Sequence, residues 1–247
     1  MTHSRGRARI AALVPFTNTN LEPDLILMCP EGVSLHFARL GGYDQDEIPN
    51  AEQMHGLGAS DLNEPLRLLQ GARPDVILYG CTSATLTHGF AFDQELSQGI
   101  KADSGAETVT AAGALLHALK TLCLRRIGFA SPYVPAINDL AIAFLADAGI
   151  ETVARSEVDS VLDNYGQGAM DPEEVHELGL LADNDKAEAI VLSCTDMRSV
   201  ETIARLEQSL GKPVITSNQS MMFQAMQLAG IGDTLMGFGR LLERNRL

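Results

Sequence analysis

Short apolar runs alternate with longer segments of helical periodicity along most of this chain. Segments 10–14, 33–39 and 76–80 have the length and composition of strands, and the residues between them carry apolar positions at helical spacing. The second half repeats the alternation, with strands predicted at 126–130, 151–155, 189–193 and 214–216. Strands that alternate with helices are typical of parallel sheets covered by helices, so the pattern predicts an α/β fold.

The segments between these strands predict the helices. Asp171-Pro172 is a typical helix start, because proline is tolerated in the first turn and an acid is favoured near the N-terminus. We interpret the Met-rich segment 218–229 as a buried packing helix rather than a ligand pocket. The predicted helices are a first one starting near Asp24, then 50–70 with interruptions at Gly56 and Gly58, 82–99, 109–122, 137–148 ending at Gly149, 199–210 and 218–229.

Several landmarks recur in the same order in both halves. The spacing between partners falls gradually from 117 to 113 to 106 residues, and the pairs are Pro15 with Pro132, Cys81 with Cys194, and Val109-Thr110 with Ile215-Thr216. Such ordered self-similarity indicates an internal duplication. If a pseudo-two-fold axis relates the halves, Cys81 and Cys194 come from equivalent strand ends and face one another across a cleft.

Both cysteines follow a buried strand at a point where a helix is expected to begin. The positive end of a helix favours thiolate over thiol, so two such positions suggest a paired acid/base or nucleophilic site. The alternative is that each cysteine fills space in the core, as free cysteines often do. The repeat favours the functional interpretation for this pair.

The charge of the chain limits its partners. A net charge of −14 and a pI near 4.7 argue against nucleic acid or an anionic membrane as a partner. They do not exclude a small anionic substrate, because local hydrogen-bond donors can outweigh a screened global charge. With 45% hydrophobic residues the chain can bury a sizeable core, and no apolar stretch approaches the roughly 20 residues of a membrane span.

The N-terminal segment and the cysteine usage point to a cytoplasmic protein with reduced thiols. The first nine residues are basic, but the apolar stretch after them is broken by Pro15, so no signal peptide is expected. Cys29, Cys81, Cys123 and Cys194 lack the close spacing of zinc sites and disulfide frameworks, and no metal is expected.

Other common chemistries lack their motifs. The chain has no G-x-G-x-x-G after a strand, no G-x-x-x-x-G-K-[ST] and no G-x-S-x-G, and its histidines are scattered. Small polar side chains instead gather beside the strand ends, where they can hold carboxylates or simply cap helices and turns. They are Thr17, Asn18, Thr82, Ser83, Ser131, Tyr133, Thr195, Ser217 and Asn218.

Some of these residues fall in motifs that resemble a known family. Val14-Pro15-Phe16-Thr17-Asn18-Thr19…Glu22 resembles the P-S-S-N-T-x-x-E opening of maleate cis-trans isomerases and arylmalonate decarboxylases, within the cofactor-independent aspartate/glutamate racemase superfamily. Phe16 departs from that pattern, where a small hydroxyl residue is expected. Later segments are similar to further family motifs in the same order, namely Tyr79-Gly80-Cys81-Thr82-Ser83, Ser131-Pro132-Tyr133, Asp163-Asn164, Leu192-Ser193-Cys194-Thr195 and Gly211-Lys212-Pro213-Val214.

The resemblance runs from about residue 10 to about residue 230 and implies an architecture. It implies two similar Rossmann-like (flavodoxin-like) parallel-sheet domains related by a pseudo-two-fold, with the active site between them and one cysteine from each. We place residues 1–110 plus 218–247 in the N-terminal domain and residues 111–217 in the second domain. The resemblance also implies that no cofactor is needed and that the chain forms a homodimer or higher homo-oligomer.

The resemblance further implies a reaction on a small dicarboxylic acid. Cys81 would add to the double bond of maleate, and Cys194 would donate and then remove a proton on the opposite face, so that fumarate is released after rotation. Glycine is typical of the decarboxylases at the first cysteine position, so Cys81 favours an isomerase or racemase. The expected substrate-binding residues are Asn18, Thr82, Ser83, Tyr133, Asn164 and Thr195.

Three alternatives remain at this stage. A racemase would use the two thiols to remove and return the α-proton of an amino acid or a related carboxylic acid. An arylmalonate-type decarboxylase would need only Cys194 as proton donor. A small-ligand binding protein would carry both cysteines as structural residues with ordinary reactivity.

Overall fold

The computed structural model describes residues 6–41 and 48–244. The outer ends of the first predicted domain, residues 1–5 and 245–247, and the segment 42–47 lie outside the described residues, as does part of the basic N-terminal segment. The domain boundaries themselves stay a prediction.

Two four-stranded parallel sheets form the framework, and both have the same strand order. The first sheet has the order β2 (Val33–Leu40), β1 (Ala8–Pro15), β3 (Val76–Tyr79) and β4 (Glu107–Thr110). The second has the order β6 (Glu151–Glu157), β5 (Arg126–Ser131), β7 (Ala189–Leu192) and β8 (Val214–Thr216). The α/β class and the duplicated architecture predicted from the sequence are therefore confirmed.

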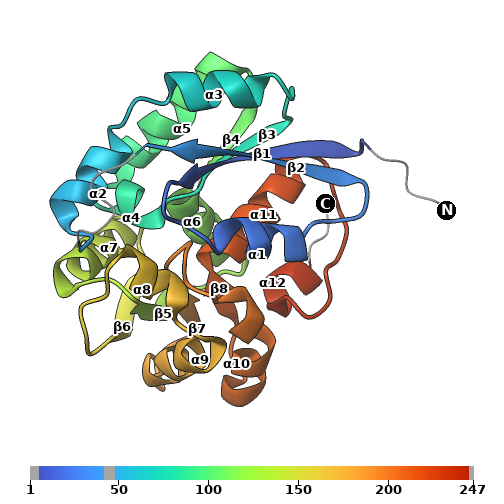
Figure 1. Cartoon of the computed structure of the whole chain (residues 1–247). Helices are drawn as coiled ribbons and strands as arrows, with labels where there is room; N and C mark the ends of the chain where they lie inside the picture. The colour runs from blue at the N-terminus through green and yellow to red at the C-terminus, as the bar shows by residue number, and fades with distance from the viewer. Residues whose placement is uncertain (1–5, 42–47, 245–247) are drawn as a thin grey trace.

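Helices cover both sheets, and two of them lie between the sheets. In Figure 1 the first sheet lies above the second, and α6 (Ala111–Thr121) and α11 (Ser217–Leu228) fill the space between them. These two helices pack against each other, and each contacts strands of both sheets. The remaining helices are α1 (Leu21–Leu27), α2 (Ala51–Gly58), α3 (Asn63–Gln70), α4 (Thr82–Leu86), α5 (Phe90–Ser104), α7 (Pro135–Asp147), α8 (Asn164–Ala169), α9 (Pro172–Leu181), the 3₁₀ turn η1 (Val200–Thr202), α10 (Ile203–Leu210) and α12 (Gly239–Glu243).

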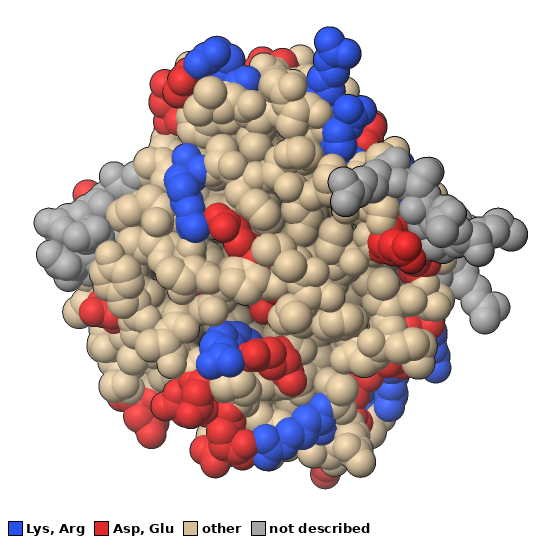
Figure 2. Space-filling model, turned by 45° about the vertical axis from the view of Figure 1, so that its right-hand side comes forward, with Lys and Arg blue, Asp and Glu red and all other residues tan. Residues whose placement is uncertain are grey.

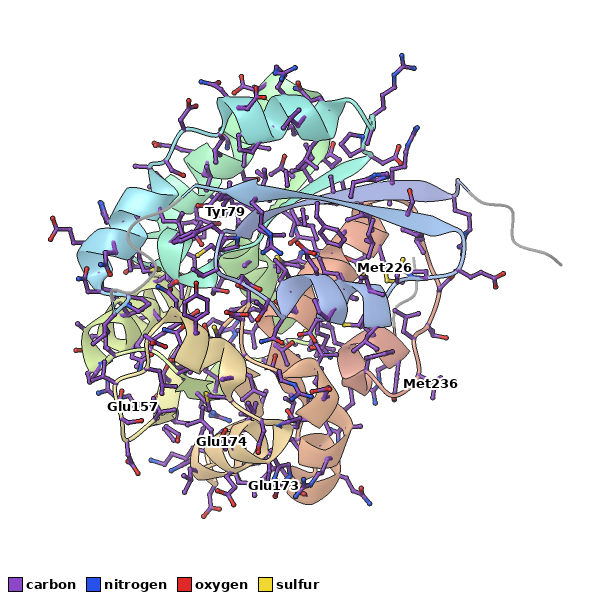
Figure 3. All side chains as sticks on the ribbon, viewed as in Figure 1. Tyr79, Glu157, Glu173, Glu174, Met226 and Met236 are labelled. Atoms are coloured by element: carbon purple, nitrogen blue, oxygen red, sulfur yellow. The ribbon has the colours of Figure 1, made fainter. Side chains whose placement is uncertain are left out.

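The Met-rich helix is buried, as expected. Met221, Met222 and Met226 of α11 are fully buried, whereas Met236, in the loop after this helix, is 73% exposed. Figure 3 shows Met226 inside the layer between the sheets and Met236 at the outer edge. Unbranched methionine side chains fill the irregular space where a helix packs between two sheets.

Two local predictions are wrong, and two short helices were missed. Residues 109 and 110, predicted as the start of a helix, belong instead to strand β4 (Glu107–Thr110). The helix predicted for 82–99 is broken after Leu86, and α5 begins at Phe90 behind its N-cap residue Gly89, whose φ is +87°. The short helices α8 and α12 were not predicted.

Charges are dispersed over the visible surface. On the face shown in Figure 2, acidic and basic side chains lie mostly toward the periphery, and much of the middle is uncharged. Among the described residues, no helix is both long and apolar enough to cross a bilayer.

Candidate active site

A small cavity of about 40 Å³ lies where the carboxyl ends of the central strands of both sheets meet. Both predicted catalytic cysteines line it and are nearly buried, with Cys81 5% and Cys194 3% exposed. The full lining is Pro15, Phe16, Thr17, Asn18, Pro49, Met54, Leu57, Cys81, Ser83, Tyr133, Ile137, Asn164, Gln167, Cys194, Thr195 and Asp196. Ligands of open parallel sheets bind at this edge, which agrees with the expected position of the site.

The short connection between β3 and α4 fixes the position of Cys81. A Cβ atom at Gly80 would lie 2.3 Å from Leu21 Cδ2 and 2.8 Å from the Leu13 carbonyl oxygen, so only glycine fits here. Cys81 is the N-cap residue of α4, and its Sγ lies 3.7 Å from the Ser83 hydroxyl. That hydroxyl donates to Met54 Sδ at 2.9 Å, which ties α2 to the cavity.

Cys194 lies at the equivalent end of β7, but in a different local setting. No helix begins directly after it, because the chain forms bends until the 3₁₀ turn at Val200. The Asp196 backbone N–H donates to Cys194 Sγ at 3.3 Å, and the thiol points toward Gln167 Oε1 at 3.9 Å. The expectation that both cysteines precede a helix is thus correct for Cys81 and wrong for Cys194.

The helix start after Cys81 does act toward thiolate, as predicted, but burial acts more strongly in the opposite direction at both cysteines. Burial raises the pKa of the Cys81 thiol, although the backbone amides of Ala84 and Ser83 and the Ser83 hydroxyl act in the opposite direction. Burial and the nearby Asp196 carboxylate raise the pKa of Cys194 to about 12. At Cys81 the desolvation of a charged sulfur therefore outweighs the effect of the short helix α4. Cys194, with its pKa raised to about 12, is a thiol at neutral pH.

Asn18 presents a hydrogen-bond donor to the cavity. Its Oδ1 accepts from the backbone N–H groups of Asn20 at 3.1 Å and of Leu21 at 2.9 Å, at the start of α1. These two bonds fix the orientation of the amide, and its Nδ2 donates to Thr195 Oγ1 at 3.0 Å. One of the two Nδ2 hydrogens remains for a ligand, which suits a carboxylate.

Thr195 and Thr82 use their hydroxyls within the protein. Thr195 Oγ1 donates to the Gly80 carbonyl at 2.9 Å, so it joins the ends of β7 and β3. Thr82 Oγ1 donates to Ser217 Oγ at 3.0 Å, is fully buried and does not line the cavity. Of the eight site residues predicted from the sequence, Thr82 is the one whose side chain lies outside the cavity.

Tyr133 connects the two halves of the site. Its hydroxyl interacts with the Cys194 thiol and with the Ser83 side chain, and burial raises its pKa well above the usual value. The phenol is therefore neutral and can donate a hydrogen bond near either sulfur. Asn164, the first residue of α8, is 7% exposed and lines the same cavity.

Two polar residues of the cavity were not predicted. Gln167 lies on α8, which the sequence pattern did not reveal. Asp196 follows the predicted Cys194-Thr195 motif directly, and its position after a buried strand could have identified it. Its carboxylate accepts from the backbone N–H groups of Thr19 at 2.8 Å and Asn20 at 3.0 Å, and burial raises its pKa to about 6.

The cavity is lined mainly by thiol, amide and hydroxyl side chains. No group of histidine, cysteine, aspartate and glutamate among the described residues is arranged to hold a metal ion. A buried thiol from each sheet, a neutral phenol and an oriented amide surround a space suited to a small carboxylic acid. Such a set can deliver a nucleophile and a proton to one molecule.

Comparisons with known proteins agree with this architecture. A family model described as arylmalonate decarboxylase matches residues 10–242. A maleate isomerase of Pseudomonas putida is 24% identical over 248 residues, with 95% of this chain and 97% of the relative covered. An arylmalonate decarboxylase of Bordetella bronchiseptica is 27% identical over 252 residues, with 95% and 93% covered.

A solved structure shares the fold. It is a mutant of the Nocardia farcinica maleate cis-trans isomerase with a covalently bound succinylcysteine intermediate, and it superposes with a TM-score of 0.85 at 22% identity. The match covers 96% of this chain and 98% of that one.

Proposed function

The chain belongs to the arylmalonate decarboxylase family. Within this family, we propose that it is a cofactor-independent two-cysteine isomerase that converts maleate to fumarate. The observation that carries the proposal is that Cys81 and Cys194, from equivalent strand ends of two sheets, line one small cavity. Curated relatives that match almost the whole chain are named maleate isomerases. Cys81 separates this chain from a decarboxylase, which needs only the second thiol.

In the proposed reaction Cys81 is the nucleophile. Its thiolate adds to one carbon of the double bond, while the Cys194 thiol gives its proton to the neighbouring carbon, which leaves a succinyl thioether. The bond between the two carbons is then single and rotates. The Cys194 thiolate removes the proton, the carbon–sulfur bond breaks, fumarate leaves and the Cys81 thiolate is restored. The Cys81 proton is thus lost once rather than in every turnover.

The two thiols suit different roles in this scheme. Cys194 has its pKa raised to about 12, which keeps it protonated as a donor. The backbone amides of Ser83 and Ala84 lie beside the Cys81 sulfur and stabilise a thiolate once it forms, and the Ser83 hydroxyl can turn its hydrogen from Met54 to that thiolate. We assign the substrate carboxylates to Asn18, Tyr133, Asn164 and the amides near Thr82 and Thr195, with Ser83 beside them.

Proton NMR in deuterated water tests this proposal. Purified protein is incubated with maleate, aspartate, glutamate, a hydroxy-diacid or a phenylmalonate, and the wild type is compared with Cys81→Ser. Conversion of maleate to fumarate that Cys81→Ser abolishes supports the proposal. Exchange of an α-hydrogen without isomerisation would instead indicate a racemase, and loss of carbon dioxide a decarboxylase. Full turnover by Cys81→Ser would refute the nucleophile assignment.

We also propose that the protein works as a cytoplasmic homo-oligomer. All four cysteines are free in the structure, which suits a reducing compartment. Homo-oligomers with closed symmetry are the common assembly of enzymes of this kind. Light scattering on the purified protein tests the assembly, and a monomer at micromolar concentration would contradict it.

A further inference from the structure

We propose that Asn218, near the start of α11, is a positioning residue for Cys194: it holds the peptide between Thr195 and Asp196 so that the N–H of this peptide faces the Cys194 sulfur. The inference rests on the proposed two-thiol function and deepens it, because it names a side chain outside the cavity that prepares Cys194 for its proton transfer.

Asn218 is fully buried and donates two hydrogen bonds through its amide nitrogen. Its Nδ2 donates to the Thr195 carbonyl oxygen at 3.0 Å and to Asp24 Oδ2 at 2.7 Å. The amide cannot turn over, because its own oxygen would then face a carboxyl oxygen and a carbonyl oxygen. Asp24 lies on α1, which packs against α11 (Figure 1), so one helix fixes the amide that the other helix directs at the loop after β7.

The Thr195 carbonyl and the Asp196 N–H belong to one peptide unit. Such a unit is planar, and in its trans form the C=O and the N–H point in opposite directions. The Asp196 N–H donates to Cys194 Sγ at 3.3 Å. Holding the carbonyl from one side therefore aims the N–H at the sulfur on the other side. A carbonyl that accepts a hydrogen bond also makes its own N–H a stronger donor.

This N–H matters most when the sulfur carries a charge. In the proposed reaction Cys194 becomes a thiolate once it has given its proton away, in a cavity where burial and the Asp196 carboxylate disfavour that charge. The Asp196 backbone N–H acts in the opposite direction. A hydrogen bond to a charged acceptor is stronger than one to a neutral thiol, so an N–H that is already aimed stabilises the charge as it develops.

Neither packing nor contact with the substrate explains an asparagine at this position. Its Oδ1 is buried without a hydrogen-bond partner among the residues that the structure describes, and an unpaired buried oxygen costs free energy. An apolar side chain of similar size would avoid that cost. The residue does not line the cavity. What the side chain contributes is its pair of donated hydrogen bonds.

Asn218→Leu removes both donated bonds with little change in volume. Because it also leaves the Asp24 carboxyl unpaired, a second variant combines Asp24→Leu with Asn218→Leu, since removing both buried partners together costs less than removing one. Ser220→Ala is the matched control. Ser220 is fully buried in the same helix, and its hydroxyl has no hydrogen-bond partner within the described part of the chain. Circular dichroism checks that each variant is folded.

Labelling with iodoacetamide at pH 9, followed by peptide mapping, tests the inference without a substrate. A hydrogen bond to a charged group changes the thiolate population about 10-fold, and roughly half of this effect on a logarithmic scale is lost because a more basic thiolate is more nucleophilic. We therefore expect both Asn218 variants to label Cys194 at least about threefold more slowly than the wild type and Ser220→Ala, with Cys81 labelled at an unchanged rate.

A merely structural role predicts the opposite direction. A loosened loop would expose the buried Cys194 thiol and speed up its labelling. Labelling of Cys194 that is unchanged or faster in the folded Asn218 variants would therefore overturn the inference.

Turnover of maleate tests the reaction separately. The Asn218 variants should lower kcat and leave KM unchanged, because Asn218 lies outside the cavity. If Cys194 labelling slows as expected but the wild type does not isomerise maleate, the positioning role stands and the proposed reaction fails. If the wild type isomerises maleate but Cys194 labelling does not slow in the variants, the two-thiol function stands and the role of Asn218 fails.

Discussion

Replacing Asn18 with Asp and, separately, with Ala distinguishes two roles of this side chain. Asn18 is 3% exposed and makes three hydrogen bonds, two accepted by Oδ1 from the start of α1 and one donated by Nδ2 to Thr195. Alanine removes all three bonds. Aspartate keeps both acceptor positions but loses the donor and adds a negative charge to the cavity.

The expected magnitudes follow from these counts. A buried hydrogen bond contributes about 1 kcal/mol net, so Asn18→Ala should lower the free energy of unfolding by about 3 kcal/mol and Asn18→Asp by about 1–2 kcal/mol. A bond to a charged substrate group contributes about 1.5–3 kcal/mol, which is roughly a 10- to 150-fold change in kcat/KM. Asn18→Asp should lose at least as much activity as Asn18→Ala, because its carboxylate also repels the substrate.

Urea denaturation followed by circular dichroism gives the stabilities, and NMR of maleate and fumarate gives kcat/KM. We expect Asn18→Asp to be the more stable variant of the two and no more active than Asn18→Ala. The reasoning fails if Asn18→Asp keeps kcat/KM within threefold of the wild type, because the amide would then not contact the substrate carboxylate. Equal stability of the two variants would refute the contribution of the two hydrogen bonds that Asn18 Oδ1 accepts at the start of α1.

Three further predictions concern stability and thiol reactivity. Burial raises the pKa of Asp24 to about 7, so between pH 4 and 7 the folded protein holds a proton that the unfolded chain has lost, and the free energy of unfolding falls as the pH rises. Asp24→Asn should reduce this fall by about a few kcal/mol in urea denaturation, and an unchanged pH dependence would contradict the prediction. In native protein at pH 7.5, iodoacetamide should label exposed Cys123 well before Cys194, and mass spectrometry showing equal rates would refute the protonated state of Cys194. Gly80→Ala should lower the melting temperature, with a loss of about 1–3 kcal/mol from overpacking against Leu13 and Leu21, and an unchanged melting temperature would show that β3 shifts freely.

All strands except β4 followed from local patterns, whereas their order in each sheet came from the structure. The duplicated landmarks placed Cys81 and Cys194 at equivalent strand ends, and the structure has both in one cavity. The same duplication would have predicted β4 as a strand, since Val109-Thr110 matches Ile215-Thr216, and residues 214–216 were predicted as a strand. Apolar periodicity alone could not separate β4 from α6, because this four-residue strand runs directly into the helix. Thr110, the last residue of the strand, is also the N-cap of α6 and accepts a hydrogen bond from the Gly113 N–H.

The thiol protonation states could not be read from the sequence. A helix after Cys81 was predictable, but the balance between its short dipole and the loss of solvent depends on Met54, Tyr133 and other residues brought from distant segments. Gln167 was missed for a related reason, because its role depends on α8 folding over the cavity and that segment has no strong periodic pattern. Asp196 was within reach, since it follows directly after the Cys194-Thr195 motif.

The central claim is that Cys81 forms a carbon–sulfur bond with the substrate while Cys194 handles the proton. Its most direct test is the mass of the intact Cys194→Ser variant after incubation with maleate, followed by peptide mapping. We predict a gain equal to one molecule of maleic acid, located on Cys81 and absent from the variant that carries both Cys81→Ser and Cys194→Ser. Unmodified protein, or a modification on Cys29 or Cys123 instead, would contradict the account.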